Sequence, residues 1–187
     1  PKVQETLDSL IGFVNSFETA ALAPVVPVLQ MRRVLLTGAT GFLGRHFLAY
    51  LLERIDVSIE KVYCPVRAPT DAKAMARVVE AMTTCGLWNE SLREKLCVFA
   101  GDLHDIHFGA SAELYSELTS ECDGVYHFAS SLKLAASFEE LRKANCEALL
   151  PVIKLCLTAK MKHLFLASTL GIFPQYFCQF GNEFADK

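Results

Sequence analysis

The chain has 187 residues, of which 52% are hydrophobic and 21% are charged, and its 18 Lys and Arg against 21 Asp and Glu give a net charge of -3. An apolar fraction this high with so small a net charge is typical of a folded globular chain and excludes a disordered one. The slight acidic excess excludes nucleic acid as a partner, because binding to phosphates requires a basic face. The length predicts one domain of about 150 residues with a short extension.

Seven cysteines are spread along the chain without a C-x-x-C pair, so the sequence predicts neither a zinc ribbon nor a thioredoxin-like motif. Their odd number and wide spacing, with no signal peptide at the N-terminus, favour reduced and mostly buried thiols in a cytoplasmic protein. Residues 9–29 carry only one charge, Glu18, but prolines and polar residues interrupt the stretch. We therefore expect no membrane span.

Residues 4–22 predict an amphipathic helix with one apolar stripe. The stripe consists of Leu7, Leu10, Ile11, Val14, Phe17 and Ala21. Pro24 and Pro27 end this helix, so residues 1–30 form a helix and a proline-containing linker. The helix either packs on the main domain or links it to a preceding domain, and the two alternatives are compatible.

From residue 31 onward, short apolar runs alternate with helical periodicity. The expected strands cover residues 34–37, 61–67, 96–100, 124–128 and 163–167. The expected helices cover residues 42–54, 71–85, 111–120 and 138–160, the last one bent by Pro151. This alternation predicts an α/β fold, a Rossmann-type doubly wound parallel sheet over residues 31–187. Because the chain ends shortly after the fifth strand, we expect a truncated domain without its substrate domain.

The most informative motif is a glycine-rich turn between the first strand and the first helix that follows it. It runs Thr37-Gly38-Ala39-Thr40-Gly41-Phe42-Leu43-Gly44. A dinucleotide pyrophosphate requires a tight turn, a close backbone approach and the positive end of a helix, which glycines in this context provide. The spacing G-x-x-G-x-x-G therefore predicts dinucleotide binding.

The second strand indicates which dinucleotide is bound. NAD-binding chains carry a carboxylate at its end, about 20 residues past the glycines, whereas this chain has Arg67 and no acid. A guanidinium suits a 2′-phosphate, and Arg45 after the last glycine is a second candidate. We predict NADP rather than NAD, with surface positions for both arginines as the alternative.

Together these motifs resemble the extended short-chain dehydrogenase/reductase superfamily, and most closely the thioester reductase domains of nonribosomal peptide synthetases and carboxylic acid reductases. The resemblance covers roughly residues 31–175. It is carried by VLLTGATGFLGRHFLAYLLER, VYCPVRA, the Gly86-Leu87-Trp88 region, AGDL at 100–103, DGVYHFAS at 123–130, LRKANCEALL at 141–150 and HLFLASTLGIF at 163–173.

The resemblance implies roles for residues that follow the third and fourth strands. Asp102 and Leu103 would flank the adenine, and Ala129 and Ser130 would line the central part of the cofactor. Phe128 stands where the family often has Asn, which puts a side-chain hydrogen bond at that point in doubt. A further residue, Asn145, would tie the long helix to the loop beside it.

The resemblance also places a hydroxyl after the fifth strand. Thr169, with Ser168 as its neighbour, would donate a hydrogen bond to the substrate oxygen and stabilise charge during hydride transfer; the alternative is a hydroxyl that caps a turn. The catalytic Tyr-x-x-x-Lys is absent, because no tyrosine in the chain has Lys four residues later. The chain is therefore expected to bind cofactor without catalysing.

These features predict the cofactor-binding part of an NADPH-dependent reductase of carrier-bound thioesters. Its partner would be an acyl or peptidyl carrier domain with a phosphopantetheine arm, joined through the N-terminal helix. Another extended reductase, such as a fatty acyl-CoA reductase or a nucleotide-sugar epimerase, and a non-catalytic NADP-binding module remain as alternatives. His104, Asp105 and His107 do not predict a metal site, since no third ligand has a familiar spacing, and Cys178 lacks a histidine placed to activate it.

Overall fold

A computed structural model describes residues 2–19, 22–53, 59–133 and 135–169 of the chain. Within these residues, parallel strands form one sheet in the order β3-β2-β1-β4-β5. The strands are β1 (Arg33–Thr37), β2 (Lys61–Val66), β3 (Leu96–Ala100), β4 (Gly124–His127) and β5 (His163–Leu166). The chain winds outward from β1 to β3 and then returns to the other side of β1 with β4. The predicted doubly wound parallel sheet is therefore confirmed.

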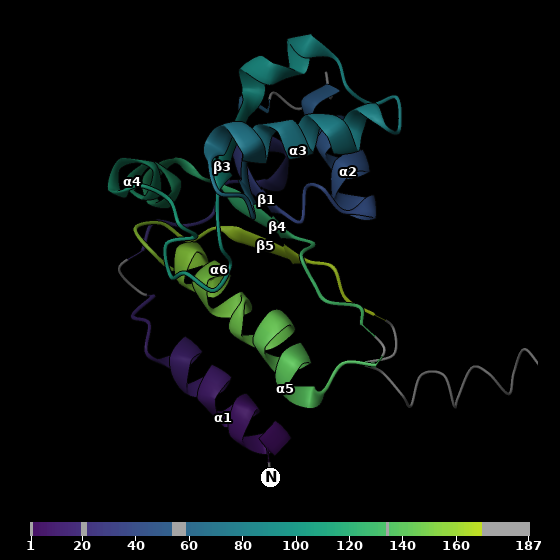
Figure 1. Cartoon of the computed structure of the whole chain (residues 1–187). Helices are drawn as coiled ribbons and strands as arrows, with labels where there is room; N and C mark the ends of the chain where they lie inside the picture. The colour runs from purple at the N-terminus through teal and green to yellow at the C-terminus, as the bar shows by residue number, and fades with distance from the viewer. Residues whose placement is uncertain (1, 20–21, 54–58, 134, 170–187) are drawn as a thin grey trace, which may run out of the picture.

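Helices cover both faces of the sheet (Figure 1). Helices α2 (Phe42–Glu53) and α3 (Asp71–Thr83) lie on one face, and α4 (Ala112–Glu121) and α6 (Leu149–Cys156) lie on the other. Short 3-10 helices at Val28–Gln30 and Glu90–Lys95 complete the connections. This two-sided cover explains why the strands are apolar runs without alternation, since both faces of a parallel sheet are buried.

Alternate residues of β1 enter two separate cores. Val34 and Leu36 pack with Leu48 of α2 and Val78 of α3, whereas Leu35 packs on the opposite side with apolar residues of α4 and α6. Such period-two separation is the geometry of a strand between two helical layers. The cores on the two faces therefore fix the direction in which every residue at the strand ends points.

The helix expected over residues 138–160 is interrupted. It consists of α5 (Phe138–Leu141), a π-helix (Arg142–Glu147) and α6 (Leu149–Cys156). Ser137 and Glu140 form a capping box at its start. Pro151 lies in the first turn of α6, where a missing backbone N–H is tolerated, and the wider π-helix precedes it. The bend at Pro151 stays a prediction, and the irregularity in this helix is the π-helical segment, one turn before the proline.

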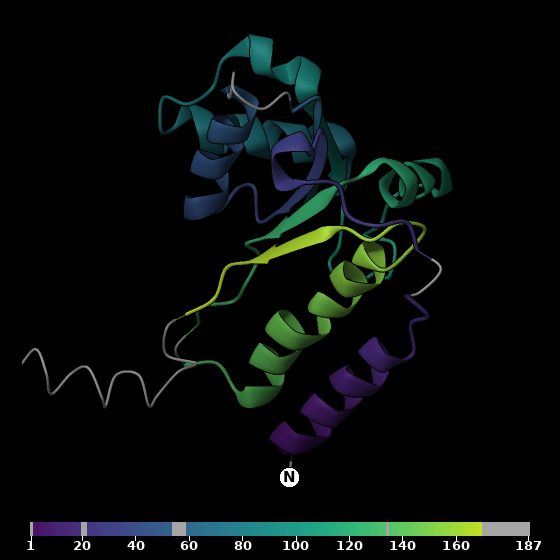
Figure 2. The ribbon, with the colours of Figure 1, turned by 180° about the vertical axis from the view of Figure 1, so that it is seen from behind.

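The N-terminal helix α1 (Lys2–Asn15) is shorter than predicted and ends well before Pro24. It lies alongside α5 and α6, outside the helical layer, in both views of the molecule (Figures 1 and 2). None of its residues is buried. Leu7, Ile11 and Val14 of the predicted stripe are 41–49% exposed, so only part of that stripe faces the domain.

The cysteines in the described ranges are free thiols in this structure. Cys64, Cys122 and Cys156 are buried, and burial raises the pKa of Cys156 to about 12. Cys97 and Cys146 are half-buried, Cys85 is exposed, and Cys178 lies outside the described residues. Of the helices in the described ranges, none has both the length and the apolar character that a membrane crossing requires.

Candidate functional site

The candidate site lies where the order of the strands reverses, between β1 and β4. The glycine-rich turn follows β1, and the loop Phe128–Ser131 follows β4, so both lie at the carboxyl edge of the sheet. Open parallel sheets bind their ligands outside this edge, at the point of reversal. The sequence predicted both segments but not that they touch each other.

The glycines of the turn are required by close backbone contacts. Gly38 has a φ of +73°, and a Cβ there would lie 2.8 Å from the backbone nitrogen of Ala129. A Cβ on Gly44, in the first turn of α2, would lie only 2.0 Å from the carbonyl oxygen of Gly38. Gly41 completes the turn by donating its N–H to that same oxygen at 2.9 Å. The glycines thus leave an open backbone cradle at the N-terminus of α2, as a pyrophosphate requires.

Thr37 ties the glycine turn to the loop after β4. It is fully buried, and its hydroxyl accepts the N–H groups of Phe128 and Ala129, each at 3.2 Å. The remaining hydroxyl hydrogen points to Nδ1 of His127, 3.0 Å away, which places the proton of the neutral imidazole on Nε2. Burial lowers the pKa of His127, in agreement with a neutral ring. Thr37 was predicted to bind cofactor; its observed contacts are those of a support beneath the site.

Phe128 stands where the family often has Asn, and its side chain packs against other rings. Its ring lies 5.1 Å from that of Phe47 in α2, which in turn lies 4.6 Å from Tyr126. Tyr126 stacks on Phe165 of β5 at 4.6 Å. This aromatic cluster links α2, β4 and β5 below the loop, so the residue that departs from the family pattern fixes the loop through apolar contact.

Asn145 holds the same loop from the opposite side, as expected. Its Oδ1 accepts the N–H of Ser131 at 2.6 Å, and its Nδ2 donates to the carbonyl oxygen of Ser131 at 3.1 Å. Asn145 lies in the π-helix Arg142–Glu147. Single-turn π-helices occur frequently at functional sites. Ala129 is half-buried and Ser130 is exposed, so the loop is accessible at the carboxyl edge of the sheet.

Arg67 follows β2 and is exposed, beside a second arginine that the sequence analysis did not select. Arg77 of α3 donates from its guanidinium to the carbonyl oxygen of Arg67. The two residues are ten positions apart, and α3 carries Arg77 back to the end of β2. The signal that could have identified Arg77 is a second arginine on the helix that follows VRA.

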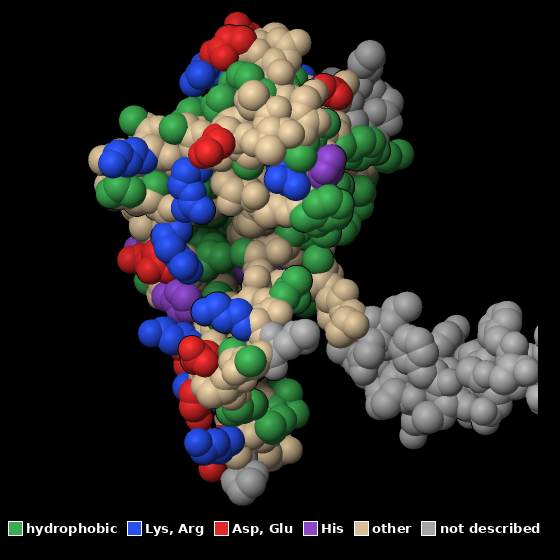
Figure 3. Space-filling model, turned by 45° about the vertical axis from the view of Figure 1, so that its right-hand side comes forward, with side chains coloured by type: hydrophobic (Ala, Val, Ile, Leu, Met, Phe, Trp, Pro, Cys, Tyr) green, Lys and Arg blue, Asp and Glu red, His purple; other side chains and the backbone are tan. Residues whose placement is uncertain are grey.

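Arg45 lies directly after the last glycine and is half-buried. Its Nε is buried and has no hydrogen-bond partner in the part of the chain that the structure describes, and its guanidinium lies 5.7 Å from the ring of Phe42. Phe42 and Leu43 are 77% and 50% exposed. Hydrophobic side chains gather on the surface over this helical layer (Figure 3). An arginine in the first turns of α2 with an unsatisfied Nε fits an anionic group at the start of this helix.

Asp102 follows β3 and is exposed, whereas Leu103 is half-buried against the α4–α6 core. Oδ1 of Asp102 accepts the backbone N–H of His104 at 2.9 Å and lies 3.0 Å from Nδ1 of the same residue. These hydrogen bonds lower the pKa of Asp102, first the backbone bond and then the ring. A carboxylate held in this way remains an acceptor at neutral pH.

Ser168 and Thr169 lie just beyond β5 and are exposed. The backbone N–H of Ala167 donates to the carbonyl oxygen of His127, so this segment continues along β4 toward the loop Phe128–Ser131. Thr40 is half-buried within the glycine turn. Among the described residues, no group of three or more His, Cys, Asp or Glu side chains is arranged to hold a metal ion.

Comparison with known proteins agrees with this geometry. The family whose model matches residues 36–186 is an NAD-binding family described as Male sterility protein. The large subunit of L-2-aminoadipate reductase from Penicillium chrysogenum is 37% identical over 74% of this chain. A nonribosomal peptide synthetase from Aspergillus flavus is 36% identical over 75% of this chain. The chain spans only 10% and 14% of the lengths of these two relatives.

Solved structures show the same likeness. The terminal R domain of the myxalamid PKS-NRPS pathway superposes with a TM-score of 0.76 and 28% identity over 89% of this chain. The PhqB reductase domain from Penicillium fellutanum gives a TM-score of 0.71 and 26% identity over 89% of this chain. In both comparisons the chain covers 42% of the solved domain. The chain therefore shares its fold with these reductase domains.

Proposed function

The chain belongs to the NAD-binding family described as Male sterility protein, and on that premise we propose that it is the NADP-binding part of a reductase of carrier-bound thioesters. The observation that carries the proposal is the backbone cradle of the glycine turn at the start of α2, where Arg45 follows the last glycine and its Nε has no partner among the described residues. The relatives named above, an aminoadipate reductase and a nonribosomal peptide synthetase, support thioester reduction as the activity.

In the proposed complex, the backbone of the turn from Gly38 to Gly44 holds the pyrophosphate. Arg67 binds the 2′-phosphate, and Arg77 adds a second positive charge beside it. Residues 64–68, at the end of β2, include no carboxylate, and Oδ1 of Asp71 in α3 already accepts the backbone N–H of Ala100 at 2.7 Å. This favours NADP over NAD. Asp102 and Leu103 enclose the adenine, while Ala129 and Ser130 line the central part of the nucleotide.

When bound, the nucleotide supplies a hydride to the carbonyl carbon of the thioester, so that the carrier thiol leaves and an aldehyde or, after a second transfer, an alcohol results. The exposed hydroxyls of Thr169 and Ser168 donate to the substrate oxygen and stabilise the negative charge that develops there. These hydroxyls follow β5 and so approach the crevice from the side opposite to Arg67. The carrier domain, with its phosphopantetheine arm, would adjoin α1 and the linker that follows it.

The chain itself is proposed to bind NADPH without turnover. A hydride transfer to a carbonyl requires a proton for the oxygen, and tyrosine with a lysine four residues later is the expected source. The tyrosines at 50, 63, 115, 126 and 176 are followed at that spacing by Arg, Arg, Thr, Ser and Phe. NADPH absorbance in the presence of an acylated carrier should therefore stay constant with this chain alone.

Calorimetry with NADP⁺ and NAD⁺ tests the cofactor. We expect NADP⁺ to bind more tightly, and Arg67→Ala to weaken NADP⁺ binding by about tenfold or more while NAD⁺ binding is unchanged, because charge-assisted bonds to phosphate are lost. Arg93→Ala is the matched control, since Arg93 is an exposed arginine paired with Glu90 in the Glu90–Lys95 helix. Equal affinity for the two nucleotides would contradict the NADP assignment, and absence of binding to either would contradict the site.

A further inference from the structure

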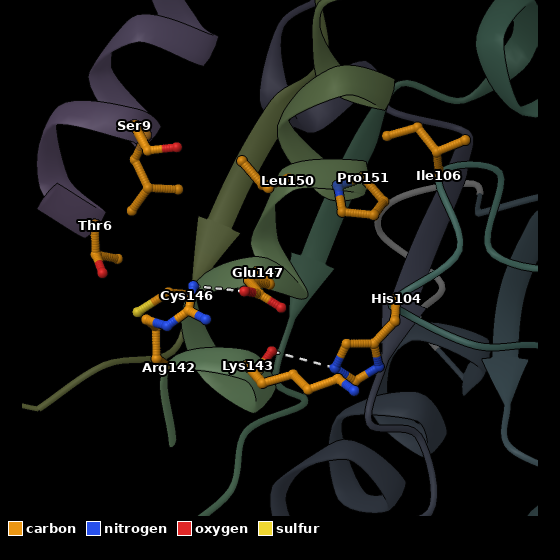
Figure 4. A pocket seen from close by; sticks show the side chains of 11 residues that line it. Thr6, Ser9, His104, Ile106, Arg142, Lys143, Cys146, Glu147, Leu150 and Pro151 are labelled. Atoms are coloured by element: carbon orange, nitrogen blue, oxygen red, sulfur yellow. Dashed lines mark hydrogen bonds and ion pairs between the residues drawn. The ribbon is translucent and has the colours of Figure 1, made fainter. Parts of the chain in front are cut away.

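His104 joins two walls of the proposed cofactor crevice. Its ring lies between the carboxylate of Asp102, after β3, and the backbone of Lys143, in the π-helix. Figure 4 shows the contact with Lys143. The Nδ1 atom is 3.0 Å from Oδ1 of Asp102, and Nε2 is 3.1 Å from the carbonyl oxygen of Lys143. The loop and the π-helix are 39 residues apart in sequence, and the imidazole bridges them.

Both atoms that face the ring are hydrogen-bond acceptors. A neutral imidazole carries one N–H and can donate to only one of them, whereas the imidazolium donates to both. The bridge is therefore complete only when His104 is protonated. Histidine is the side chain whose ordinary charge change falls between pH 5 and 8.

The bridge bears on both ends of the crevice. At one end it engages Oδ1 of Asp102, and Oδ2 is the second acceptor that the same carboxylate can offer to a ligand. At the other end it fixes Lys143, two residues before Asn145, whose amide forms the two hydrogen bonds to Ser131 in the loop after β4. One histidine thus connects the carboxylate expected at the adenine with the loop expected at the centre of the cofactor.

We propose that His104 is a positioning residue whose protonated form clamps the adenine loop to the π-helix and so strengthens NADP binding. The inference rests on the proposed function, because it deepens the same site. The clamp acts through Asp102 and Asn145 and does not itself contact the nucleotide. Its consequence is a cofactor affinity that is greater when His104 is charged.

Charged groups of both signs line the pocket of which His104 forms one wall. His104 lines a pocket of about 460 Å³ between α1 and the π-helix (Figure 4). The titratable or charged side chains that line the pocket beside His104 are Arg142, Lys143, Cys146 and Glu147. Arg142 is paired with Glu147 at 2.5 Å, and Arg67 acts on Asp102 from the end of β2. The carboxylate of Asp102 is therefore the group that balances the charge of the imidazolium.

His104→Phe tests the clamp, because it keeps a planar ring and removes both ring nitrogens. The measurement is the dissociation constant of NADP⁺ for the 187-residue chain by calorimetry at about pH 6 and about pH 8. We expect the variant to bind about tenfold more weakly than the wild type at the lower pH and only about twofold more weakly at the higher pH. Because the variant and the wild type are compared at the same pH, protonation of the phosphates of NADP⁺ affects both dissociation constants equally.

Two further variants separate the clamp from simple packing. His104→Gln can still donate to the carbonyl oxygen of Lys143 but does not titrate. At about pH 6 its affinity for NADP⁺ should therefore lie between those of the wild type and His104→Phe. The ratio of the NADP⁺ affinities of His104→Gln and His104→Phe should not change with pH. His107→Phe is the matched control in the same loop, since the ring of His107 lies against Tyr115 at 4.3 Å. The control should retain the wild-type pH dependence.

A readout without cofactor keeps this inference distinct from the proposed function. Amide hydrogen exchange at Ser131 and Asn145 should be about fivefold faster in His104→Phe at about pH 6, because the π-helix loses its connection to the loop after β3. If the wild type binds neither nucleotide, the cofactor assignment fails, and the exchange rates still decide whether the clamp exists. Unchanged exchange, or an NADP⁺ affinity ratio that is the same at both pH values, would overturn the clamp.

Discussion

Helices α1 and α2 have similar lengths, 14 and 12 residues, and both carry apolar side chains, yet the fold treats them differently. Helix α2 lies on the sheet and buries Gly44, Leu48, Ala49, Leu51 and Leu52. Helix α1 lies on the outside of α5 and α6 and buries none of its residues. Helix α2 is the more apolar of the two and also meets the face of the sheet, and both features make it part of the core, since most helical stability comes from the packing of an apolar face. Helix α2, which starts at the candidate site, is therefore the one that core packing holds in position.

The same leucine substitution should separate the two helices most clearly. Leu48 is fully buried in α2, so Leu48→Ala should lower the free energy of unfolding by about 3–4 kcal/mol through lost burial and the cavity left behind. Leu10→Ala in α1 removes a half-buried side chain and should cost about 1 kcal/mol or less. Urea denaturation of both variants measures the difference, and equal costs would show that α1 is part of the core.

A glycine substitution should act with opposite sign in the two helices. Alanine is the better helix former by about 1 kcal/mol, so Gly12→Ala in α1, where a Cβ meets nothing within 4 Å, should stabilise the chain. Gly44→Ala in α2 should destabilise it by roughly 2–3 kcal/mol and weaken nucleotide binding, because the Cβ would overlap the carbonyl oxygen of Gly38. Thermal denaturation and NADP⁺ calorimetry on both variants check this; stabilisation by Gly44→Ala would refute the cradle geometry.

Threonine hydroxyls offer a third matched pair. Thr37→Val keeps the shape but leaves two partly buried N–H groups and Nδ1 of the buried His127 without their partner, at a cost of about 2 kcal/mol. Thr6→Val in α1 removes only a local bond to the carbonyl oxygen of Lys2 and should change stability by less than about 0.5 kcal/mol. Thr37→Ser retains the hydroxyl and should recover most of the stability in the same denaturation experiment.

His127 should add a smaller, pH-dependent effect. Because burial lowers its pKa in the folded chain, the unfolded chain binds more protons below about pH 6.5, and the stability contributed by the neutral ring is lost as the pH falls through the folded value. In His127→Asn, an amide oxygen can accept from Thr37 without titrating. The stability advantage of the wild type over this variant should therefore shrink between about pH 7 and pH 5. A constant difference would show that His127 does not titrate on unfolding.

Most of the fold could be predicted from the sequence, since its signals are local. The apolar runs gave each strand to within one or two residues, and the glycine after Thr37 gave the first turn. The errors lie where packing overrides the pattern. The periodicity of residues 4–22 predicted one long helix, whereas α1 ends at Asn15. The run from 138 to 160 hid a π-helix, because side-chain periodicity does not distinguish one widened turn from an α-helix.

The candidate site divides in the same way. The glycine turn, the arginine at the end of β2 and the hydroxyls after β5 could be selected as candidates from the sequence, because residue type and position relative to a strand suffice for that. Only the tertiary structure decided that Arg77 lies beside Arg67, that Thr37 supports the loop after β4, and that His104 joins Asp102 to the π-helix. These contacts link segments that are distant in sequence, and which polar groups meet across a sheet edge depends on strand order and register, which no local pattern encodes.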